Sequence, residues 1–219
     1  MGGSSGLTHV IPATDISLPD VRQTFETNVF GVMAMVQAFA PLLVAARGLI
    51  VNVASLAALT PYCFGSVYCA TKGAVVSYSR TLRLELAPFG VRVMVAMVGT
   101  VKSNIAKQHR RLPPGSIYER VRDLFEWRLN YSQNNATVDT DVFARRFVAD
   151  SLKPEWNLFC RAILGWGRPD WFYFGGSAGL MKLGNWVGEW LIDTVCWYMF
   201  RMNKLAAVLQ QEREQKKLK

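Results

Sequence analysis

A strand, a loop, a helix and a second strand follow one another in the first hundred residues, and this order constrains the fold more than any other feature. Residues 48–55 form a short apolar run rich in β-branched side chains, which is typical of a strand buried on both faces of a parallel sheet. Helical spacing of apolar residues begins at Val67 and ends before Pro88. Residues 91–98 are a second strand-like segment. The order predicts a right-handed crossover and an α/β fold with parallel strands.

Three polar side chains follow from this arrangement. Ser55 falls at the carboxyl end of the first strand, where open α/β sheets bind their ligands. Tyr68 and Lys72 are four residues apart and therefore share one face of the predicted helix. A free tyrosine has a pKa of about 10, so we expect the Lys72 cation to favour the phenolate and to lower the pKa of Tyr68. Ser55 would hold a substrate carbonyl, and the pattern indicates acid–base chemistry.

Four motifs resemble the successive signatures of the short-chain dehydrogenase/reductase family, in family order and at family-like distances. They are Asn28-Val29-Phe30-Gly31, Asn52-Val53-Ala54-Ser55, Tyr68-x-x-x-Lys72 and Gly99-x-Val101-x-Ser103. The resemblance implies a doubly wound, Rossmann-like parallel sheet. It also implies a catalytic tetrad, with Tyr68 as acid, Lys72 lowering its pKa and binding the nicotinamide ribose, Ser55 orienting the carbonyl and Asn28 holding a relay water.

The resemblance further implies which residues meet the cofactor. Asn28, Tyr68, Lys72, Val101 and Ser103 would line the nicotinamide end, and Ser103 stands where the family usually has a threonine. The hydroxyl of Ser103 would contact the carboxamide group of the nicotinamide. The family usually has Pro-Gly after the second strand, whereas this chain has Val-Gly at residues 98–99. The conformation of that loop is therefore less well defined by the resemblance.

A narrower resemblance joins four other segments to fungal 1-acyldihydroxyacetone-phosphate reductases: residues 12–15, 35–43, 83–91 and 101–105. It implies NADPH as hydride donor and a ketone substrate, lipid-like or anionic. It also implies a place on the cytoplasmic face of the endoplasmic reticulum or on lipid droplets, and otherwise in the cytoplasm. A polyketide- or terpenoid-derived ketone of fungal secondary metabolism is the alternative substrate, because the same subfamily resembles reductases recruited to that chemistry.

A glycine-rich turn after a first strand, which normally cradles the dinucleotide pyrophosphate, has no counterpart in this sequence. Residues 3–6 stand instead where the family's Asn-Asn-Ala-Gly motif would end. We therefore expect an N-terminally truncated fold in which the strand ending at Ser55 has an open apolar edge. Such a chain would bind NADPH weakly and tend to aggregate. A catalytically inactive remnant is the competing interpretation from another functional class.

The 219 residues, 51% of them hydrophobic, suffice for a sizeable core. We divide them into the remaining dinucleotide-binding and catalytic core (1–105), a substrate lid with the last strand (106–174) and an apolar, basic helical extension (175–219). Residues 186–202 are apolar except for Glu189, Asp193 and Arg201. This segment is either an interfacial or re-entrant membrane helix, or a helix packed on the substrate pocket or on a second subunit of a homo-oligomer.

The net charge of +9 is not gathered in a block interleaved with aromatic residues, which argues against nucleic acid as a partner. Four basic residues after the second strand either form a solvated face or meet an anionic substrate: Lys102, Lys107, Arg110 and Arg111. The four cysteines form no C-x-x-C pair and there are only two histidines, so we expect free thiols and no metal site.

Overall fold

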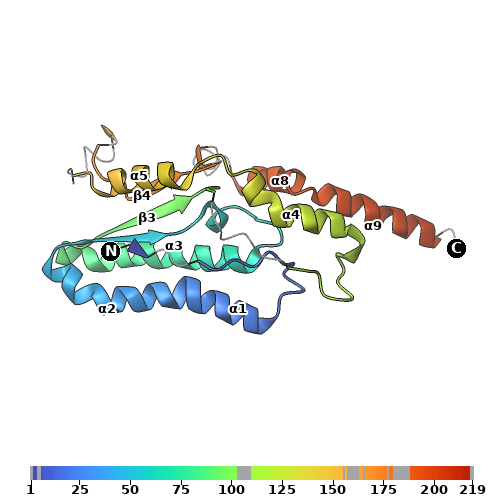
Figure 1. Ribbon diagram of the computed structural model, residues 1–219, viewed down its shortest axis with the longest axis horizontal. Coiled ribbons are helices and arrows are strands. Elements are labelled where there is room, and N and C mark those ends of the chain that lie inside the picture. Colours follow the sequence, from blue (N-terminus) through green and yellow to red (C-terminus); the bar gives the residue numbers. More distant parts are fainter. Residues whose placement is uncertain are drawn as a thin grey trace.

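The computed structural model has one sheet of four parallel strands in the order β1-β2-β3-β4 (Figure 1). It describes residues 2–3, 6–102, 110–154, 156, 163–164, 166–176, 178–179 and 188–217. The strands are β1 (Gly2–Gly3), β2 (Leu49–Val53), β3 (Arg92–Val98) and β4 (Trp171–Phe174). The α/β class, the parallel sheet and the three longer strands agree with the sequence-based prediction.

Strand β3 lies at the centre and is covered on both faces. Val93, Val95 and Met97 point to one side of the sheet, whereas Met94 and Ala96 point to the other. All five are almost inaccessible to solvent. Parallel pairing sets Ile50 opposite Val93 and Val53 opposite Ala96, so β2 and β3 reach the same end of the sheet together. That end carries the candidate site.

The first face of the sheet is covered by α3 (Ser66–Leu86) and by a continuous helical run. The run consists of α1 (Leu18–Phe25), a π-helical turn (Glu26–Phe30) and α2 (Gly31–Ala45). Val29, Val32 and Val36 of the run pack against α3 and the sheet. By length and composition alone, the segment Leu18–Ala45 is apolar enough to cross a membrane. A core helix meets the same test, and its valines do pack in the core.

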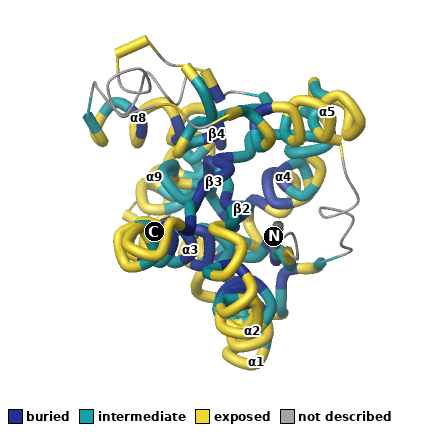
Figure 2. Tube along the Cα trace, turned by 90° about the vertical axis from the view of Figure 1, so that its left-hand side faces the viewer, coloured by how far each residue is buried: buried dark blue, intermediate teal, exposed yellow. Residues whose placement is uncertain are grey.

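The second face is covered by α5 (Thr140–Ser151), whose Phe143 and Phe147 stack and pack edge-on against Phe172 of β4. Figure 2 shows α5 and α3 on opposite sides of the buried strands. Three further helices extend past the carboxyl ends of the strands (Figure 1). They are α4 (Arg122–Asn134), α8 (Glu189–Met199) and α9 (Met202–Lys217). The short 3-10 turns are Leu56–Ala58, Ala87–Phe89 and Glu119–Val121.

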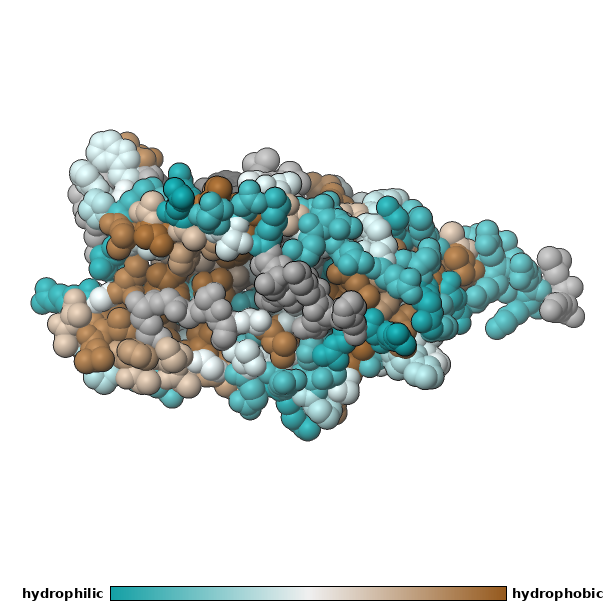
Figure 3. Space-filling model, viewed as in Figure 1, coloured by the Kyte–Doolittle hydropathy of each residue, from teal (hydrophilic) through white to brown (hydrophobic). Residues whose placement is uncertain are grey.

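The outer edge of β2 is only partly covered. Strand β1 pairs with β2 at Val51 and Asn52, so the predicted open edge is narrower than expected. Figure 3 shows apolar surface over the part of the molecule that holds α2 and the sheet, in contrast to the hydrophilic α9. Met35, Phe39 and Leu42 of α2 are exposed. Aggregation through this region stays a prediction.

Candidate active site

Ser55 is placed by the chain as it leaves β2. It caps the 3-10 turn at Leu56–Ala58, and its Oγ accepts a hydrogen bond from the backbone N–H of Ala57 at 3.2 Å. The hydroxyl of Ser55 lies close enough to the phenol of Tyr68 to act on its pKa. A strand-end serine thus meets the phenol from the first turn of α3, as the sequence predicted.

Lys72 lies one turn further along α3 and is 5% exposed. Its Nζ donates to the carbonyl oxygen of Val53 at 2.9 Å and lies 5.7 Å from the centroid of the Tyr68 ring. Val53 is the last residue of β2. One hydrogen bond therefore fixes α3 against the end of the strand and brings Ser55, Tyr68 and Lys72 together.

The electrostatics of the pair correct one expectation. Burial raises the pKa of Tyr68 to about 12, and the nearby hydroxyl of Ser55 only partly opposes this rise. Burial lowers the pKa of Lys72 to about 8. The predicted fall in the pKa of Tyr68 is therefore wrong in this structure, because loss of hydration dominates and the ammonium of Lys72 bonds to the carbonyl oxygen of Val53. At neutral pH the pair is a protonated phenol beside an ammonium.

Asn28 is fully buried in the π-helical turn and acts as a clamp. Its Oδ1 accepts from the N–H of Leu7 at 2.7 Å. Its Nδ2 donates to the carbonyl oxygen of Leu7 at 2.8 Å and to Oγ1 of Thr71 at 3.0 Å. Both amide hydrogens are engaged, so the predicted relay water would have to donate a hydrogen bond to Asn28, either at the remaining lone pair of Oδ1 or at its backbone carbonyl oxygen.

Thr71 is a site residue that the sequence reasoning missed. It is fully buried, accepts from Asn28 and donates from Oγ1 to the carbonyl oxygen of Tyr68 at 2.8 Å. It therefore links the clamp to the turn that carries the phenol. A single threonine inside an amphipathic helix gives no sequence signal for such a role.

The predicted cofactor residues are only partly described. Val101 lies beyond β3 in an isolated parallel bridge with Val138, and Ser103 lies outside the described residues. Lys72 fits a nicotinamide ribose by its donors. Its ammonium has three N–H groups, and within the described part of the chain one is used, on Val53. Two remain for ribose hydroxyls at the carboxyl end of the sheet, where such ligands bind.

A cavity of about 260 Å³ lies beside the 3-10 turn that follows Ser55, and Ala57 is the first residue of its lining. Its lining is Ala57, Ala58, Leu59, Thr60, Pro61, Cys69, Glu189, Ile192 and Asp193. The wall from the 3-10 turn is apolar, and α8 adds two carboxylates. The half-buried thiol of Cys69 reaches this cavity, whereas the sequence predicted a small core residue. Among the residues that the structure describes, no group of three His, Cys, Asp or Glu side chains could hold a metal ion.

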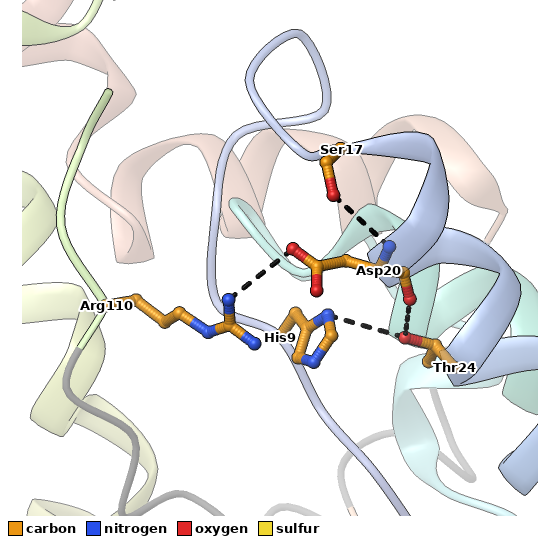
Figure 4. A network of polar contacts seen from close by, with 5 residues as sticks. All are labelled: His9, Ser17, Asp20, Thr24 and Arg110. Atoms are coloured by element: carbon orange, nitrogen blue, oxygen red, sulfur yellow. Dashed lines mark hydrogen bonds and ion pairs between the residues drawn. The ribbon is translucent and has the colours of Figure 1, made fainter. Parts of the chain in front are cut away.

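Two of the described basic residues of the loop after β3 pair with carboxylates. Lys102 pairs with Asp139 at 2.6 Å, and Arg110 pairs with Asp20 at the start of α1 at 3.5 Å. Figure 4 shows Arg110 beside the buried ring of His9, whose Nδ1 lies 3.4 Å from Oγ1 of Thr24. Burial, together with Arg110, lowers the pKa of His9. Lys107 lies outside the described residues.

Comparison with known proteins bears on the same part of the chain. A sequence model of the short chain dehydrogenase family matches residues 3–113. A short-chain dehydrogenase of Aspergillus ruber is 35% identical, over 92% of this chain and 67% of that protein. The NADPH-dependent 1-acyldihydroxyacetone phosphate reductase of Saccharomyces cerevisiae is 32% identical, over 97% of this chain and 68% of that protein. The chain spans 58% of the length of a Neurospora crassa short-chain dehydrogenase.

Solved structures share the fold. A short-chain dehydrogenase from Streptomyces avermitilis superposes with a TM-score of 0.64 at 19% identity, covering 99% of this chain and 69% of that one. The closed form of serine dehydrogenase complexed with NADP+ gives a TM-score of 0.56 at 26% identity, covering 70% of this chain and 58% of that one.

Lys72→Met tests the cost of the buried ammonium. A pKa lowered from 10.5 to about 8 corresponds to about 3 kcal/mol at neutral pH, offset by about 1–3 kcal/mol for the orphaned Val53 carbonyl. In the wild-type protein, the buried ammonium destabilises the fold by this full amount below about pH 8. The destabilisation falls as the pH rises from the folded pKa of Lys72 to its unfolded pKa of 10.5, because the folded protein then carries a neutral amine. Urea unfolding gives the free energy of unfolding of both proteins at pH 7 and at pH 10. The value for Lys72→Met minus the value for wild type should be about 2 kcal/mol lower at pH 10 than at pH 7.

The exposed Lys204 supplies the matched control, because Lys204→Met removes the same group from α9 and should show no such pH dependence. An equal effect of Lys72→Met at both pH values would mean that the ammonium is not buried as described.

Proposed function

Because this chain belongs to the short-chain dehydrogenase family, we propose that it reduces a ketone to a secondary alcohol with NADPH as the reductant. The meeting of Ser55, Tyr68 and Lys72 at the carboxyl end of β2 is the observation that carries the proposal. The NADPH dependence printed for the yeast relative supports the choice of reductant. When bound, NADPH supplies a hydride to the carbonyl carbon.

The side chains supply the remaining chemistry. With a pKa of about 12, Tyr68 keeps its proton at neutral pH, which is the form that a reduction consumes. Its O–H bond breaks as the proton passes to the developing alkoxide, a stronger base than a phenolate. Lys72 then lies beside the new phenolate, where low hydration strengthens the attraction. Ser55 orients the carbonyl oxygen by a hydrogen bond.

A 1-acyldihydroxyacetone phosphate is the substrate that we favour, because the yeast reductase named for it matches nearly the whole chain. A polyketide- or terpenoid-derived ketone is the second candidate, and the apolar wall of the cavity formed by Ala57, Ala58 and Leu59 suits it. An inactive remnant is the candidate from another functional class. Titrating the chain with NADPH and following the fluorescence of the nicotinamide distinguishes the inactive remnant from the enzyme, because a remnant does not bind NADPH and its addition causes no fluorescence change.

Tyr68→Phe should lower the rate of ketone-dependent NADPH oxidation about a hundred- to ten-thousand-fold. The affinity for NADPH should stay nearly unchanged, because the substitution removes only the proton donor. The readout is the loss of absorbance of NADPH in the presence of a ketone. Tyr78→Phe, on the same helix and packed against the core, is the matched control and should keep wild-type turnover. Retention of most of the turnover by Tyr68→Phe would contradict the role.

We propose the cytoplasmic face of the endoplasmic reticulum or a lipid droplet as the location. Ile192 and Cys196 of helix α8, and Phe200 just after it, are buried against Tyr62 and Tyr131, which agrees with a helix packed beside the pocket. Its other face exposes Trp190, Trp197 and Tyr198. Indole and phenol rings on one helix face favour the headgroup zone of a bilayer, and this supports a peripheral contact.

Cosedimentation with phosphatidylcholine liposomes tests that contact. Wild-type chain should pellet with the vesicles, and the double variant Trp190→Ser/Trp197→Ser should lose most of this binding because it removes the exposed rings. Trp166→Ser controls for the loss of an exposed tryptophan elsewhere, since Trp166 is 52% exposed outside α8. Equal pelleting of all three proteins would contradict a role for α8.

A further inference from the structure

Arg128 of α4 is a buried cation that forms no ion pair with any carboxylate in the described part of the chain. It is 1% exposed, and its Nε donates to the carbonyl oxygen of Cys63 at 2.8 Å. Its two terminal nitrogens, Nη1 and Nη2, are buried and have no hydrogen-bond partner in the described part of the chain. A buried guanidinium is normally paired with an anion, because the loss of its hydration is costly. Burial accordingly lowers the pKa of Arg128.

Aromatic rings surround the guanidinium without satisfying it. Its central carbon lies 3.8 Å from the ring centroid of Tyr62, 5.1 Å from that of Phe200 and 5.8 Å from that of Tyr131. Ring faces attract the cation, but they do not accept the in-plane N–H groups of its planar fork. The rings therefore hold Arg128 in one orientation and leave its buried terminal donors without an acceptor.

The terminal donors lie beside the start of α3. Nη2 is 3.8 Å from the position that a Cβ on Gly65 would occupy, and Gly65 is the residue before the helix. No side chain caps this end of the 21-residue helix. The first backbone N–H groups of a helix have no acceptor within it, and its N-terminus carries partial positive charge. Two sources of attraction for an anion thus converge within one turn of Tyr68.

We propose that Arg128 and the first turn of α3 form a subsite for the anionic group, a phosphate or a carboxylate, of the ketone that is reduced at Tyr68. This inference rests on the proposed reductase function. A planar guanidinium matches two oxygens of such a group, and the aromatic rings around it keep the fork fixed.

The nearby cavity has positive charge close to its Cys69 side and negative charge on its α8 side. Cys69 lines it, and the charge of Arg128 opposes the burial that raises the pKa of the Cys69 thiol. Glu189 and Asp193 lie on the α8 side of the same cavity and repel an anion. A substrate with an apolar body would place its anionic group toward Arg128 and away from α8.

Binding of inorganic phosphate tests the subsite without any turnover. Phosphate, compared with chloride at matched ionic strength, should raise the midpoint of thermal unfolding of the full chain, and isothermal titration should give its dissociation constant. Arg128→Met should weaken phosphate binding about 10- to 100-fold, the loss expected for a charge-assisted hydrogen-bond pair. Arg145→Met, which removes an exposed arginine from α5, should bind like wild type.

Arg128→Lys covers the case in which the methionine variant does not fold. It keeps the charge but loses the fork, so it should fold and bind phosphate more weakly than wild type. Failure of phosphate to stabilise the wild-type chain, or equal affinity in wild type, Arg128→Lys and any folded Arg128→Met, would overturn the subsite.

Kinetics with dihydroxyacetone phosphate and dihydroxyacetone place the anion on the substrate. Arg128→Met, or Arg128→Lys in its place, should raise KM for the phosphorylated ketone and leave both KM for the neutral ketone and KM for NADPH unchanged. A rise in KM for NADPH alone, or equal rises for both ketones, would overturn the substrate role. If wild type reduces neither ketone but phosphate binding still depends on Arg128, the anion subsite stands and the proposed function for these ketones fails.

Discussion

The hydrogen bond from the buried ammonium of Lys72 to the carbonyl oxygen of Val53 is the contact on which the active site depends. Val53 ends β2, Ser55 follows two residues later, and Tyr68 lies one turn before Lys72. A single contact between helix and strand therefore sets how the phenol meets the serine hydroxyl. It also holds a cation where hydration is poor, which destabilises the fold and keeps a charge beside the proton donor.

Other buried polar side chains near this contact also join segments that are far apart in the sequence. Asn28 joins the backbone of Leu7 to Thr71, and Thr71 supports the turn that carries Tyr68. Arg128 is a second buried cation, held against the ring of Tyr62 close to the start of α3. The terminal nitrogens of Arg128 have no acceptor in the described part of the chain, and a buried cation of this kind attracts an anion strongly because little water screens it.

Sequence reasoning located the elements with strong periodicity and the residues that belong to spaced motifs. Strands β2, β3 and β4, helix α3, and the grouping of Ser55, Tyr68 and Lys72 follow from such patterns. The pKa of Tyr68 was predicted in the wrong direction, because spacing on a helix does not reveal how deeply a phenol is buried. Arg128 and Thr71 were missed, since their roles depend on contacts between segments more than forty residues apart. Helix α5 was missed because its apolar stripe is interrupted by charged residues.

The most direct test of this account is the titration of Lys72 itself. NMR of the chain with labelled lysine side chains, assigned by comparison with Lys72→Met, reports the pH at which the ammonium loses its proton. The account predicts a pKa of about 8 for Lys72, against about 10.4 for a lysine in a model peptide. An ordinary pKa for Lys72 would contradict it, because the ammonium would then be hydrated and could not tie α3 to the end of β2 as described.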